Sequence, residues 1–281
     1  MRSVDSVIHP NAGLPIGPTV DSSAARKPAR TTLRGRLVTV APLDPAAHEE
    51  ALYQGTHGAD REKLWLYLGE GPFPDRASFR AYLEKRSQSD DPLSYAIIHN
   101  ATGKAAGHAS FMRMAPEHRV IEVGNIFYTA TLAHSAAGTE AMYLMAKHVF
   151  DDLGYRRYEW KCNALNEPSR RAAHRLGFSF EGIFRQHMIQ KGRSRDTLAV
   201  LLRSASWRSL PPSSSAAATA AAPPQRMDFL PASGRSANRS CSVFPCGRRP
   251  LNRRYAAGHG WPASSQVGKT SAWQSRRRGC Q

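Results

Sequence analysis

The sequence predicts a mixed α/β domain, of the α+β type, with one central sheet. Stretches that alternate apolar and polar residues are separated by stretches of helical periodicity, in the order β-ααα-β-β-β-α-β-α-β-β. Residues 120–164 read as a strand, a helix and a second strand, which is a βαβ unit. We therefore expect about seven strands in one mixed sheet.

The first part of the domain reads as one strand followed by helices. Residues 37–40 alternate apolar and polar side chains and stop at Pro42. Asp44 before Pro45 is typical of a helix start, because Asp caps the first N–H groups and Pro fits the first turn. The predicted helices span residues 45–55, 60–68 and 75–86.

The second part supplies most of the sheet. Residues 100–103 form a turn between two alternating stretches, and Lys191 and Gly192 form another near the end. Gly154 and Gly177 are typical of residues that end a helix. The predicted strands span residues 93–99, 105–114, 120–129, 155–164, 180–190 and 197–203, and the predicted helices 139–153 and 166–176.

Positive charge is concentrated outside the predicted domain. The 281 residues carry a formal net charge of +17, with 39 Lys and Arg against 22 Asp and Glu. Residues 204–281 hold 12 of these cations and one acid, Asp228, in a Ser-, Ala-, Pro- and Arg-rich stretch. Such a composition cannot bury enough apolar surface to order the chain. We expect an irregular leader at 1–32, one domain at 33–203 and a disordered basic tail at 204–281.

Composition also excludes several classes of protein. The longest apolar runs, such as residues 198–202, are far shorter than the ~20 residues of a membrane-spanning helix. The N-terminus has no apolar core followed by a small-residue cleavage site, so we expect no secretion signal and a cytoplasmic location. Only Cys162 of the four cysteines lies in the predicted domain, with no zinc-type spacing around it. We expect neither a disulfide framework nor a metal site.

Two segments with glycine are candidates for contact with a ligand. Gly124 lies inside a predicted strand, where glycine marks a bulge or a close approach of backbone. Residues 131–138 are mostly small and precede the predicted helix at Thr139, whose N–H groups and partial positive charge can hold an anion. The segment has neither a GxGxxG pattern nor a Walker lysine, so it also fits an ordinary connection.

Three polar positions allow both a structural and a catalytic interpretation. Asn166 and Ser169 are residue types expected at a helix start, and the same side chains can bind a ligand. Glu122 lies within an apolar strand, two residues before Gly124. Because a buried carboxylate is costly unless it is paired, Glu122 is either ion-paired or kept for proton transfer.

The most specific pattern in the chain is the run N-x-x-S…LGF-x-x-EG between residues 166 and 182. Together with VIEVGNIFY at 120–128, the loop and helix that follow it, and FRQHMIQKGRSRDT at 184–197, this run resembles the GCN5-related N-acetyltransferase (GNAT) superfamily. The branch it resembles includes the bacterial ribosomal-protein N-terminal acetyltransferases. The resemblance covers residues 33–203 and implies a mixed sheet with helices on both faces.

The resemblance implies a transferase that moves acetyl from acetyl-CoA, its co-substrate, directly to an amine without a covalent enzyme intermediate. The strands at 120–129 and 155–164 are implied to splay apart. The pantetheine arm would then pair with the backbone of Ile126, Phe127 and Tyr128 as an added strand. A strand N–H near the bulge would stabilise the thioester oxyanion.

The family's pyrophosphate loop, Q/R-x-x-G-x-G/A, matches this chain imperfectly. Gly138 fits, but Ala133 lacks the long polar side chain and Ala136 replaces a glycine. Backbone N–H groups make most phosphate contacts, so Ala136 is tolerated at negative φ, whereas the loss at Ala133 weakens affinity for the cofactor. His134 is a substitute phosphate contact. The positions implied to hold the phosphates are Ala133, His134, Ser135, Ala136, Ala137, Gly138 and Thr139.

Three side chains are implied to act next to the reacting groups. Asn166 bonds to the pantetheine, and Ser169 contacts the coenzyme sulfur and gives it a proton. The amine must be unprotonated to attack the thioester, so a base has to act on it directly or through water, and we assign Glu122 to this role. Glu181, in the EG pair, is assigned a structural role.

Several alternatives stay open at this point. The acceptor is a protein N-terminus or a small-molecule amine, and the enzyme is a monomer or a homodimer. A non-catalytic CoA-binding module on the same fold is the alternative function, because the pyrophosphate loop is irregular. The tail combines arginine clusters with Trp261 and Trp273 but has no nucleic-acid motif, so we expect no nucleic-acid partner. The tail also fits an out-of-frame extension of a GC-rich gene.

Overall fold

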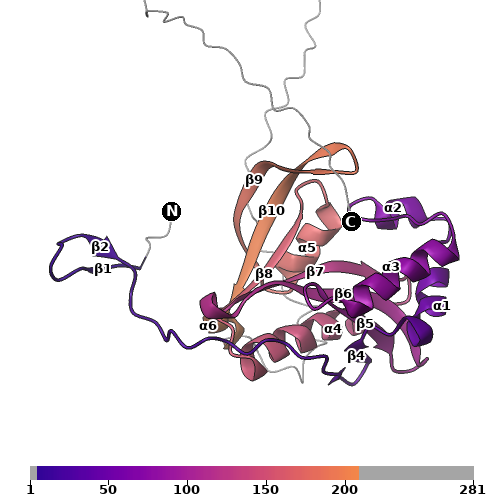
Figure 1. Cartoon of the computed structure of the whole chain (residues 1–281), viewed down its shortest axis with the longest axis horizontal. Helices are drawn as coiled ribbons and strands as arrows, with labels where there is room; N and C mark the ends of the chain where they lie inside the picture. The colour runs from indigo at the N-terminus through magenta and orange to yellow at the C-terminus, as the bar shows by residue number, and fades with distance from the viewer. Residues whose placement is uncertain (1–4, 209–281) are drawn as a thin grey trace, which may run out of the picture. The chain divides into compact units, whose positions relative to one another are not determined.

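The computed structural model describes residues 5–208, which form an eight-stranded mixed sheet with helices packed on it, together with a short N-terminal hairpin (Figure 1). The order of strands in the sheet is β3-β4-β5-β6-β7-β8-β10-β9. The strands are β1 (Val7–Ile8), β2 (Pro15–Ile16), β3 (Leu33–Arg34), β4 (Val38–Pro42), β5 (Leu93–His99), β6 (Lys104–Ala115), β7 (Val120–Tyr128), β8 (Arg157–Asn163), β9 (Ser179–Gln190) and β10 (Arg193–Arg203).

The five predicted helices lie in their expected places between the strands, and one further short helix follows the last strand. Their bounds are α1 (Pro45–Thr56), α2 (Arg61–Trp65), α3 (Arg76–Gln88), α4 (Ala136–Lys147), α5 (Glu167–Arg175) and α6 (Ser204–Arg208), with a 3₁₀ turn η1 (Pro116–His118) and a π-helical turn η2 (His148–Asp152). The predicted fold class and the order of elements are therefore confirmed. The eighth strand is β3, whose two residues pair with β4.

Two apolar cores lie on opposite faces of the sheet. Successive side chains of a strand point to opposite faces. Tyr95 and Ile97 pack into the core that contains α4, whereas Ala96 between them packs into the core formed with α1, α2 and α3. Helices therefore cover both faces, and the strands between them are buried on both sides.

One pair of neighbouring strands is parallel. β7 and β8 run in the same direction, with Val120 opposite Arg157 and Val123 opposite Trp160, and every other pair in the sheet is antiparallel. The connection between β7 and β8 is α4, as expected for a βαβ unit. This crossover brings the start of α4 to the carboxyl end of β7.

Helix α4 begins three residues earlier than predicted. Ser135 is its N-cap, and the Ser135 Oγ accepts a hydrogen bond from the Gly138 N–H at 3.0 Å. The small residues that the sequence assigned to a loop therefore form the first turn, because a Ser cap satisfies one of its N–H groups. At its other end the helix continues into η2 before Gly154, whose φ of +79° lies in the left-handed region.

The ordered domain continues past the boundary predicted at residue 203. Helix α6 packs Trp207 into the larger core, where its ring stacks on Phe150 and its Nε1 donates to Asp151 at 3.0 Å. The predicted tail start at Ser204 is therefore wrong for these five residues. The rest of the predicted tail, residues 209–281, lies outside the described residues, as do residues 1–4.

The predicted leader contains one hairpin and a segment attached to the domain. Strands β1 and β2 pair with each other, with Val7 opposite Ile16. Further along, the Ala25 N–H donates to the Pro116 carbonyl at 3.0 Å, and the Tyr95 hydroxyl donates to the Ala29 carbonyl at 2.8 Å. Apart from the hairpin, the described part of the leader has no helix or strand. In residues 5–208 no helix is long and apolar enough to cross a membrane.

Candidate active site

The centre of the sheet opens where β7 and β8 stop pairing. Their parallel register ends at Val123 and Trp160, although β7 continues to Tyr128 and β8 to Asn163. Beyond that point the β8-facing edge of β7 has no strand beside it. Such an edge presents unpaired backbone N–H and C=O groups to the gap, as an added strand would require.

A β-bulge in β7 marks the same position. The register between β6 and β7 shifts between His108 and Ser110, which lie opposite Phe127 and Gly124. Asn125 takes the extra position, with a φ of +52° in the left-handed region. The bulge that Gly124 predicted therefore lies one residue later. Gly124 itself packs against Met112, since a Cβ there would lie 2.5 Å from the Met112 Sδ and the flexible Met side chain would have to move.

His108 supports the bulge from the neighbouring strand. Its Nδ1 lies 2.8 Å from the Asn125 carbonyl oxygen, and its ring stacks on Phe127 with 5.0 Å between centroids. Burial lowers the pKa of His108 to about 4, so the ring is neutral near pH 7 and its Nδ1–H donates to that carbonyl. Sequence reasoning missed His108, because no local pattern distinguishes it from other strand residues.

A cavity of about 380 Å³ occupies the opening. Its lining comes from the segment after α2, the ends of β6, β7 and β8, the start of α5, and the β9–β10 hairpin. Four of the predicted site residues line it, namely Glu122, Ile126, Asn166 and Ser169. The structure therefore brings both predicted catalytic residues to one cavity, from strands and helices that are distant in the sequence.

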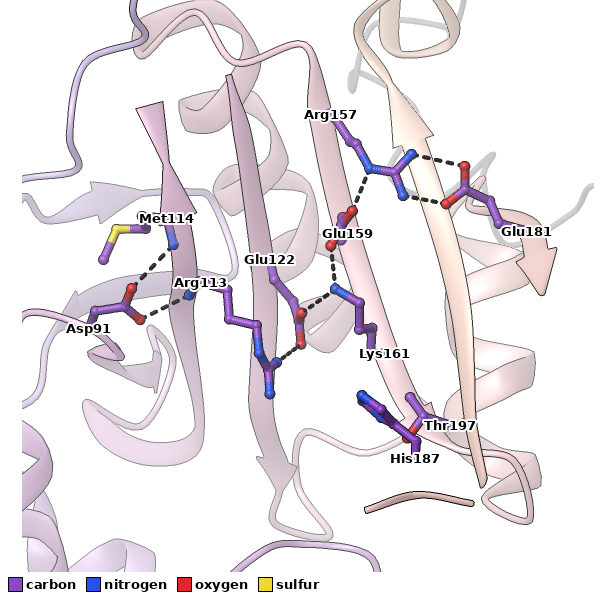
Figure 2. A network of polar contacts seen from close by, with 10 residues as sticks. All are labelled: Asp91, Arg113, Met114, Glu122, Arg157, Glu159, Lys161, Glu181, His187 and Thr197. Atoms are coloured by element: carbon purple, nitrogen blue, oxygen red, sulfur yellow. Dashed lines mark hydrogen bonds and ion pairs between the residues drawn. The ribbon is translucent and has the colours of Figure 1, made fainter. Parts of the chain in front are cut away.

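Glu122 lies at the base of the gap and is 2% exposed. Its Oε1 lies 2.6 Å from Arg113 Nη1, and its Oε2 lies 2.8 Å from Lys161 Nζ. Figure 2 shows these contacts continuing through Glu159 and Arg157 as a chain of alternating charges across β6, β7 and β8. The ion-paired interpretation of Glu122 is therefore correct, and proton transfer by it stays a prediction.

Lys161 was missed, although the sequence contains a signal for it. Arg157, Glu159 and Lys161 alternate with apolar residues along β8, so they share one face of the strand. Charges that alternate along one strand face can pair with one another and with a carboxylate on the neighbouring strand.

Asn166 and Ser169 form the predicted start of α5. The Asn166 Oδ1 accepts a hydrogen bond from the Ser169 N–H at 3.2 Å. The Ser169 Oγ accepts another from the Trp160 indole N–H at 3.0 Å, which leaves the hydroxyl hydrogen of Ser169 to be donated. Burial raises the pKa of the neighbouring Cys162 thiol, so that thiol is kept protonated and weakly nucleophilic.

The predicted phosphate positions lie outside the cavity, at the N-terminus of α4. Gly138 is needed there for close packing, since a Cβ would lie 2.7 Å from the Leu132 carbonyl oxygen. The Tyr128 hydroxyl donates to the Gly138 carbonyl at 3.0 Å and so attaches this turn to β7. The segment from Ala133 to Ser135 enters the helix through His134, whose φ is +56°.

Arg175 adds a positive charge to this helix start. Its Nη1 donates to the Thr139 Oγ1 at 2.7 Å, and no carboxylate among the described residues lies within ion-pair distance of it. Sequence reasoning missed Arg175, because the contact joins the end of α5 to the first turn of α4. The first-turn N–H groups and this guanidinium can together hold an anion.

The described residues contain no group of three or more His, Cys, Asp or Glu side chains that could hold a metal ion.

Comparisons with known proteins agree with this geometry. A family model described as Acetyltransferase (GNAT) domain matches residues 38–179. The crystal structure of a GCN5-related N-acetyltransferase from Brucella melitensis is 45% identical, with a TM-score of 0.66, over 67% of this chain and 85% of that chain. A probable GNAT acetyltransferase from Chromobacterium violaceum is 34% identical, with a TM-score of 0.64, over 70% of this chain and 100% of that chain.

A curated relative matches over a shorter stretch. The Bacillus subtilis protein named Uncharacterized N-acetyltransferase YoaA is 30% identical over 118 residues, which is 41% of this chain. The match spans 62% of that relative's length.

Proposed function

Since this chain belongs to the GNAT acetyltransferase family, we propose that it transfers an acetyl group from acetyl-CoA directly to a primary amine. The observation that carries the proposal is the separation of β7 and β8 beyond Val123 and Trp160, with Glu122 and Ser169 both facing the cavity that results. The proposal keeps the acceptor as either a protein N-terminus or a small-molecule amine. Acetylation of either kind of acceptor requires only that its amine enters this cavity.

The residues of this chain fit acetyl-CoA as co-substrate. The free edge of β7 at Ile126, Phe127 and Tyr128 supports the proposed backbone pairing with pantetheine. The first turn of α4, beside Arg175, supports phosphate binding at residues 133–139. We propose that Arg175 offsets the missing polar side chain at Ala133. When bound, acetyl-CoA supplies the acetyl group as an activated thioester.

In the proposed mechanism the amine loses a proton before it attacks the thioester carbonyl. Glu122 lines the cavity and takes this proton, directly or through one water. A backbone N–H at the bulge near Asn125 donates to the oxyanion that forms on the carbonyl. As the carbon–sulfur bond breaks, the Ser169 hydroxyl, oriented by the Trp160 indole, gives its hydrogen to the leaving sulfur and takes a proton back from solvent water.

The proposed reaction has no covalent enzyme intermediate. Cys162 is the thiol that lines the cavity, and burial raises its pKa. A protonated thiol in this position does not attack a thioester efficiently. Direct transfer within a complex of enzyme, acetyl-CoA and amine is therefore favoured.

The test measures binding and turnover separately on the full-length protein. Calorimetry with acetyl-CoA and with coenzyme A reports binding, and release of free thiol over a panel of amines and peptides reports transfer. Mass spectrometry then identifies the acetylated product. Binding without thiol release for any amine would favour the non-catalytic module, and failure to bind either compound would contradict the whole proposal.

A further inference from the structure

The cavity has a wall that the proposed mechanism does not use. This wall is the β9–β10 hairpin together with the segment from Trp65 to Gly69. The Lys191 Nζ donates to the Trp65 carbonyl at 2.7 Å, and the Gln190 Nε2 donates to the Tyr67 carbonyl at 3.0 Å. These bonds join the hairpin to the segment after α2 and so fix the position of this wall of the cavity.

The charges that line the cavity do not balance. Its cations are Arg113, Lys161, Lys191 and Arg195, and its single carboxylate is Glu122. Arg113 and Lys161 are both ion-paired with Glu122. The two cations of the hairpin have no carboxylate within ion-pair distance among the described residues. The cavity therefore has an excess of positive charge on the wall formed by the β9–β10 hairpin.

Arg195 is the better buried of the two hairpin cations. Its Nη1 donates to the Gln190 Oε1 at 2.7 Å, and its Nε is buried without a hydrogen-bond partner in the described structure. Burial lowers the pKa of the Arg195 guanidinium, with the nearby Arg113 charge acting in the same direction and Glu122 opposing it. A half-buried guanidinium with an unpaired buried N–H is costly to keep unless an anion pairs with it.

We propose that the acceptor carries an anionic group next to its amine, and that Arg195 binds this group while the amine faces Glu122. A carboxylate fits the planar fork of a guanidinium and would use its free donors. Lys191 adds charge at the same wall. This inference rests on the proposed function, because it names the substrate class of the same cavity.

Glu122 and Arg195 would then orient the acceptor together. Glu122 lies on β7 and Arg195 on β10, with β8 between these strands in the sheet. An acceptor held at its anionic end by Arg195 presents its amine toward the gap between β7 and β8. An acceptor without an anionic group cannot bind Arg195. It is therefore held in no single orientation and reacts more slowly.

The test compares matched acceptors on the full-length protein. One arm uses free amino acids, the second uses the corresponding amino acid amides, and the third uses dipeptide amides with Asp or Glu in second place. We expect kcat/KM for at least one carboxylate acceptor to exceed that of its amide by about 10-fold or more. The first and third arms distinguish a free amino acid from an acidic protein N-terminus.

Variants then assign the preference to Arg195. Arg195→Gln should remove most of the advantage of the carboxylate over the amide, and Arg195→Lys should restore part of it. Arg193→Gln is the matched control, because Arg193 is exposed on the same strand and does not line the cavity. Unchanged affinity for coenzyme A verifies that each variant is folded.

Binding of the product gives a readout that does not depend on turnover. In the presence of coenzyme A, N-acetylated amino acids should bind more tightly than their amides to the wild-type protein and lose this advantage in Arg195→Gln. Equal binding of acids and amides, or equal kcat/KM for both, would overturn the inference and leave the proposed acetyl transfer intact. Absence of acetyl-CoA binding would instead count against the proposed function.

Discussion

The Lys161 ammonium lies 2.8 Å from the Glu122 carboxylate and joins β7 to β8 at the point where these strands separate. Glu122 lies opposite Glu159 in the paired part of the two strands, and Lys161 is the residue after the last pair. The ion pair therefore closes the base of the opening. Its charges neutralise each other in a place where an isolated carboxylate would be costly.

The first prediction concerns Glu122 as the base. In Glu122→Gln the amide cannot accept the proton of the amine, so kcat should fall by about 100-fold or more. The remaining rate should rise with pH until the amine loses its own proton in solution. The measurement is kcat against pH with a saturating amine.

Glu159→Gln is the matched control for that variant. Glu159 belongs to the same network, through Lys161 and Arg157, but does not line the cavity. It should keep kcat within a few-fold of wild type. A Glu122→Gln protein with the full wild-type rate and pH profile would show that Glu122 only pairs the two cations.

The second prediction concerns Ser169 as the proton donor. Ser169→Ala should lower kcat by about 100-fold, because the leaving sulfur loses its proton source, while KM for acetyl-CoA changes only a few-fold. Trp160→Phe keeps the hydroxyl but removes the indole N–H that orients it, so its effect should be smaller. Steady-state kinetics of thiol release measures both. A fall in affinity for acetyl-CoA with unchanged kcat would mean that Ser169 binds the co-substrate but does not donate the proton.

The third prediction concerns Arg175 and the phosphates. Arg175→Gln should weaken coenzyme A binding by about 10-fold, since one charge-assisted contact is lost, and should not affect binding of pantetheine, which has no phosphate. Calorimetry with both ligands makes the comparison. Arg171→Gln serves as control, because Arg171 is exposed on the same helix and pairs with Glu167. An equal loss for pantetheine would mean that Arg175 acts on the fold.

The fourth prediction concerns pH and stability through His108. Its pKa is lowered to about 4 in the folded state, whereas the unfolded chain binds the proton near pH 6.5. The unfolded state therefore binds more protons, and the free energy of unfolding should fall by about 3 kcal/mol as the pH falls from 6.5 to 4. Urea unfolding at several pH values measures this.

The variant His108→Gln removes that titration. Its free energy of unfolding should depend less on pH between 6.5 and 4 than that of the wild type. The control His118→Gln changes a histidine that is exposed in η1, and it should keep the wild-type slope. Parallel pH dependence in wild type and His108→Gln would contradict the assignment of a buried neutral imidazole.

The fifth prediction concerns the end of the domain. Trp207 is 9% exposed, so Trp207→Ala should lower the free energy of unfolding by about 3 kcal/mol. Removal of residues 209–281 should leave both the unfolding transition and the activity unchanged, because we propose that the domain ends with α6. Thermal unfolding and thiol release measure the two effects. Loss of activity on that truncation would assign a role to the removed residues.

Much of the fold could be predicted from local pattern. The alternation in residues 93–99 predicted β5 with its observed bounds, and Asn166 with Gly177 predicted both ends of α5. The start of α4 lies three residues before the predicted one, because small residues such as those around Ser135 are typical of a loop as well as of a capped first turn. A cap acts through one side chain and one backbone group, so a single residue moved this boundary.

The candidate site could be predicted only in part. Glu122 and Ser169 were found because each stands out locally, as an acid in an apolar strand and as a serine at a helix start. Arg175 was missed because its contact with Thr139 joins residues 36 positions apart, and the partner of Lys161, 39 positions away, follows only partly from the alternating charges of β8. Arg195 was missed for a related reason. The sequence does not show which charged groups lie near it in space, and in the described structure no carboxylate lies within ion-pair distance of its guanidinium.

The sequence by itself determined the order of helices and strands, the resemblance to a family and the residue types available for chemistry. These follow from periodicity, caps and turns, which are properties of neighbouring residues. Only the tertiary structure decided that β7 and β8 separate after Val123, that Asn125 forms the bulge, and that the cavity wall at Arg195 carries excess positive charge. The register of two strands and the charge balance of a cavity both depend on residues that are far apart in the chain. They are therefore fixed only when the chain is folded.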